Sequence, residues 1–178
     1  MPDTKRLTAE QLAAAVRLIR DGGVVAFPTD TVYGIGSVDL DRLYEVKERP
    51  REKRIAYLMA AVPETLPAAA RKLANAFWPG ALTIVAGDDA FRMPDHPLAL
   101  RLLEQTGPLP VTSANRSGAG ATGDPEEVWR QLAGRIDALL DGGPCPGGQE
   151  STVVDLEGNI LRQGAIPAGA VHEALSHA

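Results

Sequence analysis

The chain has 178 residues, with 44% hydrophobic and 23% charged side chains and a formal net charge of −5. These values are typical of one globular domain, which we expect to span 1–178. No stretch approaches the ~18 apolar residues of a membrane helix, and the N-terminus MPDTKR lacks a signal-peptide pattern. A single cysteine, Cys145, excludes an internal disulfide framework and a multi-cysteine metal site. We therefore expect a cytoplasmic protein with no membrane partner.

Apolar periodicity and turn residues divide the chain into helices that alternate with strands. The clearest helix is 8–21, where Thr8 and Gln11 form a capping-box pair and Gly22 ends the helix. The other predicted helices are 39–49, 63–77, 96–105, 125–132 and a last one after 162. The predicted strands are 24–27, 55–60, 81–86, 109–112, 136–140, 151–156 and 160–162. This alternation, closed by a hairpin, predicts an α/β fold with a mixed sheet.

Positive charge is concentrated in one segment. Five of the 18 Lys and Arg residues fall within 47–54, the sequence KERPREKR. Because Pro50 fixes the chain between Arg49 and Arg51, the segment could aim its cations at a polyphosphate. A solvated helix end is the plainer interpretation, since the helix dipole favours cations there, and a tRNA backbone is a rival anion.

Two polar segments follow predicted strands, where ligands bind in α/β sheets. The first is PTDTVYGIG at 28–36, and the second is TSANRSG at 112–118. Their hydroxyl, carboxylate and amide groups suit a polar ligand, and the glycines let a ligand approach the backbone. Each segment is also consistent with an ordinary turn or a capped loop.

A literal G-x-G-x-x-G at 118–123 does not indicate a dinucleotide site. Five residues separate the expected strand end from Gly118, and the next helix opens with Asp124, Glu126 and Glu127, which would repel phosphate. We interpret the segment as a flexible loop or as a lid over a nearby site. The glycine-rich segment 142–149 lacks the Gly-Lys-Ser/Thr of a Walker A loop.

Seven motifs in a fixed order give the chain a specific resemblance. They are PTDTVYGIG (28–36), KERP (47–50), WPGALT (78–83), FRMPDHP (91–97), TSAN (112–115), ESTVVD (150–155) and LRQG (161–164). Together they resemble the YrdC-like family, the threonylcarbamoyl-AMP synthases, over about residues 10–166. The resemblance implies a single-domain twisted mixed β-sheet flanked by helices.

The resemblance also implies a reaction, in which L-threonine, bicarbonate and ATP give threonylcarbamoyl-adenylate and pyrophosphate. Thr31, Arg92 and Ser151 match the threonine-binding positions, with Arg92 on the carboxylate. The expected ATP-binding residues are Lys47, Arg49, Lys53, Ser113, Asn115 and Arg162. Lys47 and Arg49 are the expected catalytic residues, because positive charge near the phosphates stabilises departing pyrophosphate. Mg²⁺ is expected with the ATP, and no protein ligand for it is identified.

Some features depart from the family pattern. Arg54 stands where many relatives have a small residue or proline. We expect the short single-domain form, without the additional C-terminal domain of longer relatives. The expected downstream partners are threonylcarbamoyl-transferase proteins, and tRNA is a further candidate partner. Two alternatives stay open: a module that binds double-stranded RNA or tRNA, and a paralogue of the same fold that acts on another small molecule.

Overall fold

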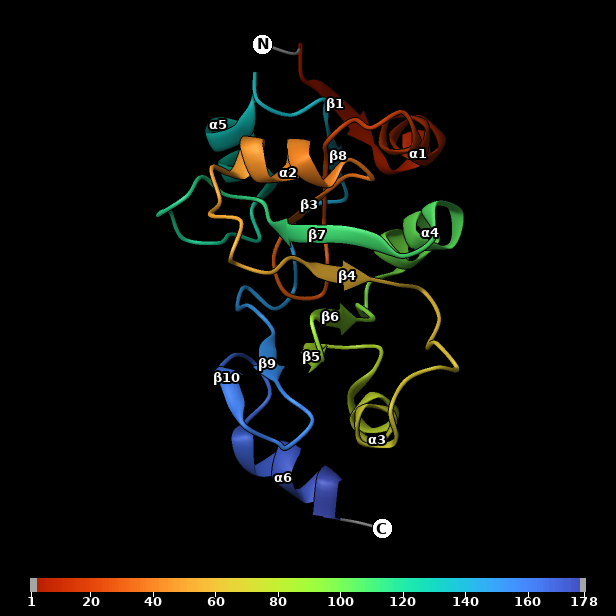
Figure 1. Cartoon of the computed structure of the whole chain (residues 1–178). Helices are drawn as coiled ribbons and strands as arrows, with labels where there is room; N and C mark the ends of the chain where they lie inside the picture. The colour runs from red at the N-terminus through yellow and green to blue at the C-terminus, as the bar shows by residue number, and fades with distance from the viewer. Residues whose placement is uncertain (1–2, 177–178) are drawn as a thin grey trace.

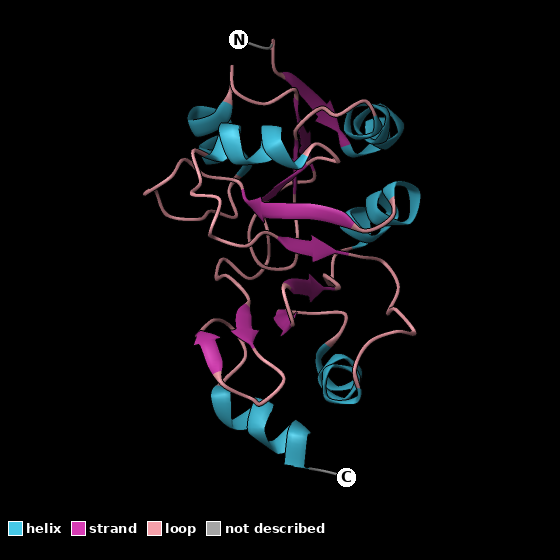
Figure 2. Cartoon of the chain, in the orientation of Figure 1, coloured by secondary structure: helices cyan, strands magenta, loops and turns pink. Residues whose placement is uncertain are grey.

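The computed structural model describes residues 3–176, so the first and last two residues of the expected domain lie outside the described part. Within it, the strands form one mixed sheet with helices packed against it (Figures 1 and 2), as predicted. The strands are β1 (Lys5–Thr8), β2 (Val25–Phe27), β3 (Gly34–Gly36), β4 (Ala56–Leu58), β5 (Leu82–Ala86), β6 (Asp89–Arg92), β7 (Leu109–Ser113), β8 (Ala138–Asp141), β9 (Thr152–Val154) and β10 (Ile160–Arg162). The helices are α1 (Leu12–Arg20), α2 (Leu40–Lys47), α3 (Ala68–Phe77), α4 (Pro97–Thr106), α5 (Pro125–Leu132) and α6 (Ala168–Ser176), and a short 3₁₀ helix, η1 (Ala9–Gln11), precedes α1.

The strands lie in the order β1-β8-β2-β3-β7-β4-β6-β5-β9-β10. Strands β1 and β2 run parallel to β8, β4 runs parallel to β6, and β5 runs parallel to β9. The remaining neighbours are antiparallel, including the predicted closing hairpin of β9 and β10. Segments far apart in the sequence therefore become neighbours, as when β3 pairs with β7.

Helices cover the sheet because successive strand residues point to opposite faces. Val25 and Phe27 of β2 pack in one apolar cluster with α1 and α4, whereas Val24 and Ala26 pack in a second cluster with α2 and α5. A third cluster joins α3 and α6 to β5 and β9, near the C-terminal end of the molecule (Figure 1). None of the helices in residues 3–176 has the length and apolar character that a bilayer-spanning segment needs.

Two helix ends follow their sequence signals. The capping box of Thr8 and Gln11 forms, with the Thr8 backbone N–H donating to Gln11 Oε1 at 2.9 Å. The first turn is 3₁₀, however, so α1 begins only at Leu12. Asp39 caps α2 by accepting a 3.0 Å hydrogen bond from the Arg42 backbone N–H, and α2 ends where Glu48 adopts the left-handed conformation (φ 51°).

The sequence does not predict three of the strands: β1, β3 and β6. Strand β3 is the tripeptide Gly-Ile-Gly, whose glycines disfavour a strand by propensity. A Cβ at Gly34 would lie 2.6 Å from Val111 Cγ1, and one at Gly36 would lie 2.7 Å from Leu109 Cδ2. These glycines therefore let β7 approach closely, and tertiary packing overrides the local preference.

Candidate active site

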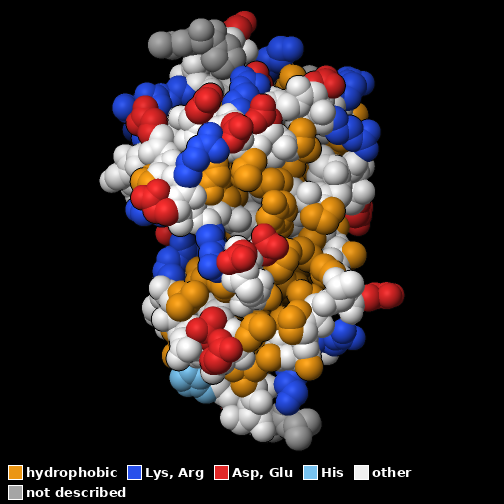
Figure 3. Space-filling model, viewed as in Figure 1, with side chains coloured by type: hydrophobic (Ala, Val, Ile, Leu, Met, Phe, Trp, Pro, Cys, Tyr) orange, Lys and Arg blue, Asp and Glu red, His pale blue; other side chains and the backbone are white. Residues whose placement is uncertain are grey.

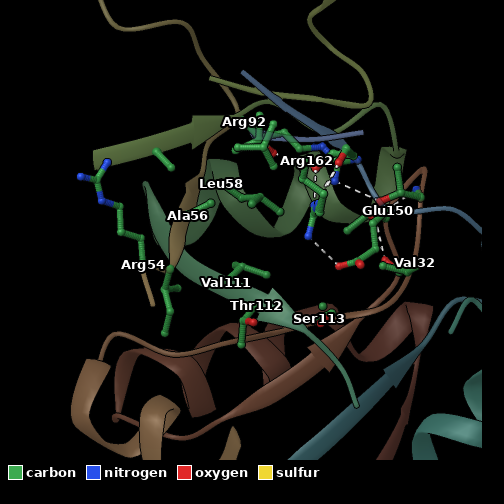
Figure 4. A pocket seen from close by; sticks show the side chains of 18 of the residues that line it. Val32, Arg54, Ala56, Leu58, Arg92, Val111, Thr112, Ser113, Glu150 and Arg162 are labelled. Carbon is green, nitrogen blue, oxygen red and sulfur yellow. Dashed lines mark hydrogen bonds and ion pairs between the residues drawn. The ribbon is translucent and has the colours of Figure 1, made fainter. Parts of the chain in front are cut away.

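Side chains from β4–β7 and from the β9–β10 hairpin line a pocket of about 530 Å³, a volume within the ~300–1,000 Å³ of small-molecule sites. Alternate residues of two strands contribute, namely Thr83 and Val85 from β5 and Ala90 and Arg92 from β6. The floor of the pocket is therefore one face of the sheet. Figure 4 shows Arg92 and Arg162 across the pocket from the β7 residues.

Arg92 is held in a buried ion pair at one end of this pocket. It pairs with Asp30, and the side chains are only 7% and 13% exposed. Its Nη1 donates to Thr31 Oγ1 at 3.0 Å, and its Nε donates to Gly80 O at 3.0 Å. Burial lowers the pKa of Arg92, and the charge of Asp30 opposes that lowering. The guanidinium therefore has a fixed position beside the Thr31 hydroxyl.

A second group of polar contacts surrounds Ser151. The buried Ser151 hydroxyl shares a 2.8 Å hydrogen bond with Thr83 Oγ1. Arg162 Nη2 donates to Ser151 O at 3.0 Å and to Ser151 Oγ at 3.2 Å, while its Nη1 contacts Glu150 Oε1 at 3.0 Å. Strands β5, β9 and β10 thus bring two hydroxyls, a guanidinium and a carboxylate together.

Lys47 does not line the pocket but organises its wall. Its buried Nζ donates to Ser113 O at 2.8 Å, to Asn115 O at 2.7 Å and to Asn115 Oδ1 at 2.5 Å. Burial lowers the pKa of Lys47 to about 8, Arg49 adds to the lowering, and Glu150 opposes it. In this structure the ammonium group connects the end of α2 to the end of β7 and fixes Ser113 and Asn115.

The basic segment 47–54 places two arginines on the pocket. Arg49 Nε and Nη2 donate to Lys53 O at 3.1 Å and to Arg54 O at 2.8 Å, so Arg49 closes its own loop while lining the cavity. Arg54 also lines the pocket, and its Nη1 donates to Gly87 O at 2.9 Å. The Lys53 side chain is exposed and is not part of the lining.

The glycine-rich segments 118–123 and 142–149 pack behind the segment 28–36. The Tyr33 backbone N–H donates to Thr122 O at 2.9 Å, and Gly148 N–H donates to Thr31 O at 2.8 Å. A Cβ at Gly147 would lie 2.5 Å from Asp30 O. This close approach needs glycine. Segment 142–149 therefore helps to hold Asp30 and Thr31 in place, and segment 118–123 helps to hold Tyr33.

The structure brings together most of the side chains singled out from the sequence. Those that line the pocket are Thr31, Arg49, Arg92, Ser113, Ser151 and Arg162. Lys47 and Asn115 do not line the pocket but donate hydrogen bonds to Ser113 O. Lys53 is also absent from the lining. Sequence reasoning gave no role to Asp30, Thr83 or Glu150. Each of them lies inside a quoted motif, and that position is the signal that could have identified them.

Charge and metal-ligating groups limit what the site can hold. In residues 3–176 there is no cluster of three His, Cys, Asp or Glu side chains that could bind a metal ion. On the face seen in Figure 3, acidic and basic side chains are interspersed, and apolar side chains run between them. Inside the pocket, four arginines and two glutamates form part of the lining, and this excess of positive charge suits a small anionic ligand.

Comparison with known proteins agrees with these motifs. The pattern of the Sua5/YciO/YrdC family, described as telomere recombination, matches residues 17–164. The chain belongs to this family. A threonylcarbamoyl-AMP synthase of Bacillus subtilis is 39% identical over 88% of the chain, and the chain spans 54% of that relative. A putative threonylcarbamoyl-AMP synthase of Mycobacterium tuberculosis is 35% identical over 92% of the chain, which spans 88% of it.

A solved structure supports the fold. The crystal structure of Pyrococcus abyssi Sua5 in complex with L-threonine superposes with a TM-score of 0.87 and 30% identity. The alignment covers 97% of this chain and 61% of that protein. The predicted family and the predicted α/β sheet architecture are both confirmed.

Proposed function

We propose that the chain is a threonylcarbamoyl-AMP synthase, which converts L-threonine, bicarbonate and ATP into L-threonylcarbamoyladenylate and pyrophosphate. The observation that carries the proposal is the lining of one pocket. It contains the buried Arg92 beside the Thr31 hydroxyl, together with several further arginines. The name of the B. subtilis relative and the L-threonine complex of Sua5 support the same assignment.

Arg92 is the proposed site for the threonine carboxylate. A guanidinium has five N–H groups, and Gly80, Thr31 and Asp30 engage one each. One N–H remains on each terminal nitrogen, which matches the two oxygens of a carboxylate. Thr31 and Ser151 then offer hydroxyls to the hydroxyl group of the substrate.

The other cations of the pocket are proposed to hold ATP. The threonine amine loses a proton and attacks the carbon of bicarbonate, water leaves, and a carbamate forms. A carbamate oxygen then attacks the α-phosphorus, and the bond to pyrophosphate breaks. Arg49, Arg162 and Ser113 line the pocket and are proposed to offset the charge that develops on pyrophosphate, with Arg162 reaching from the Ser151 side, while Lys47 keeps Ser113 in position.

Mg²⁺ is proposed to enter as part of the nucleotide substrate. The described residues offer no cluster of three protein ligands, and Mg²⁺ bound to nucleotides usually keeps several waters and phosphate oxygens as ligands. The proposed contacts between side chains and substrates do not require a metal ion held by the protein.

Pyrophosphate release tests the function directly. We expect release only when ATP, L-threonine and bicarbonate are all present, with L-threonylcarbamoyladenylate as the second product by mass spectrometry. Equal release with L-serine, or without any amino acid, would mean that the substrate assignment is wrong.

The cellular role follows from the product. We propose that a separate transferase passes the threonylcarbamoyl group to tRNA and that the reaction occurs in the cytoplasm. The interspersed charges in Figure 3 do not favour the RNA-binding alternative on that face. A tRNA mobility-shift assay tests direct tRNA binding.

A further inference from the structure

We infer that Glu150 binds the ammonium group of the amino-acid substrate, an inference that rests on the proposed function. An amino acid carries its ammonium and carboxylate groups on one carbon. The acceptor for the ammonium must therefore lie a few ångström from the guanidinium that binds the carboxylate. The charged residues lining the pocket are Arg49, Arg54, Arg92, Arg162, Glu52 and Glu150.

Among the nearby carboxylates, position and pairing favour Glu150. Asp30 lies beside Arg92, but it is already paired with that arginine, is almost buried and does not line the pocket. Glu52 belongs to the exposed loop that carries Arg49, which is proposed to bind phosphate. Glu150 directly precedes Ser151, within the polar group that includes Thr83.

Glu150 also interacts electrostatically with two cations, Arg162 and Lys47. Its carboxylate pairs with Arg162 at 3.0 Å, and the charge of Arg162 contributes to lowering the pKa of Arg92. The charge of Glu150 acts on Lys47 as well. The three cations would repel an ammonium group, so a carboxylate among them is the local group that can attract one.

The carboxylate has capacity for another donor. In residues 3–176, Oε1 accepts from Arg162, and no hydrogen bond to Oε2 is present. An ionised carboxylate accepts about four hydrogen bonds. The side chain is 39% exposed, so a ligand can reach it, and Figure 4 shows it extending toward Arg162 inside the pocket.

The backbone of Glu150 is fixed by close packing. Ala165 N–H donates to Glu150 O at 3.2 Å, and a Cβ at Gly164 would lie only 2.3 Å from the same oxygen. The glycine of the LRQG motif therefore allows the chain after β10 to press against Glu150. This contact fixes the backbone position from which the Glu150 side chain extends at the edge of the pocket.

Calorimetric titration of the full chain tests the inference with three ligands: L-threonine, (R)-3-hydroxybutyrate, which is threonine without its amine, and ATP. Glu150→Gln keeps an acceptor for Arg162 and removes the charge. We expect its affinity for L-threonine to fall about 10–100-fold, the size of a charge-assisted hydrogen bond. Affinity for the other two ligands should change less than about threefold.

Controls separate this inference from the proposed function. Glu157→Gln removes a charge from the exposed turn of the same hairpin and should change none of the three affinities. An equal loss for L-threonine and either other ligand would overturn the inference, because Glu150 would then act through Arg162 or the pocket shape. Unchanged L-threonine affinity would overturn it too. If the unmodified protein binds no L-threonine, the proposed function itself fails.

Discussion

Replacing Lys47 with methionine is expected to leave the fold intact and to slow adenylate formation about 100-fold. The pKa of Lys47 falls from 10.5 to about 8. At about 1.4 kcal/mol per pKa unit, burying this ammonium group in its charged form lowers the free energy of unfolding by about 3 kcal/mol. Removing it leaves Asn115 O and Asn115 Oδ1 without their donor, at about 1–3 kcal/mol each. The two contributions nearly cancel in the free energy of unfolding.

The loss of Lys47 is offset in the free energy of unfolding, but nothing replaces its contacts in holding Ser113 and Asn115 in position. Without the ammonium group, the end of β7 loses its connection to α2, and a displacement of about 1 Å costs ~100-fold in rate. Pyrophosphate release by Lys47→Met should therefore fall by about that factor, while the melting temperature drops by less than about 8 °C. Lys72→Met, at an exposed lysine of α3, is the matched control. Near-normal turnover would refute the role of Lys47 in positioning Ser113 and Asn115. A far larger fall in melting temperature would show that the two free-energy contributions do not cancel.

Four further predictions address the threonine site and the cysteine. Arg92→Ala should weaken L-threonine binding by about 2–5 kcal/mol and ATP binding far less, and equal losses in titration would contradict its role. Gly147→Ala places a Cβ 2.5 Å from Asp30 O and should weaken L-threonine binding about tenfold, whereas Gly120→Ala, with nothing within 4 Å, should have no effect. Burial raises the pKa of the Cys145 thiol to about 11, so at pH 8 iodoacetamide should modify the folded protein at least ~100-fold more slowly than the denatured chain. Because the unfolded thiol ionises first, this group should lower the measured stability as the pH rises from about 9 to 11.

The sequence predicts the parts of the fold whose local and tertiary preferences agree. The cap at Asp39 and the buried strand β2 follow from residue type and apolar pattern alone. Strand β3 does not, because its glycines are selected by the approach of β7 and not by strand propensity. Strand β6 follows β5 after a turn at Gly87. The apolar pattern of β5 predicts that strand but does not indicate that the chain turns back to form a second one.

The candidate site was predictable as a set of motifs but not as a geometry. Most of the motifs lie at the start or end of a strand. No single motif, however, predicts the sheet order that makes β6, β5 and β9 neighbours. Motif matching therefore identifies Arg92 and Ser151 as candidates. It does not reveal that Asp30 holds Arg92, that Thr83 contacts Ser151, or that Lys47 faces the loop oxygens.

The hairpin of β9 and β10 forms the edge of the sheet and joins it through the pairing of β9 with β5. Edge segments with few neighbours open more readily than the core, so backbone amides of this hairpin should exchange with deuterated solvent ahead of those in β2 and β8. A substrate that bridges Arg92 and Ser151 would tie the hairpin to β6. Slower deuterium uptake at 152–154 would then report occupancy of the site without any turnover.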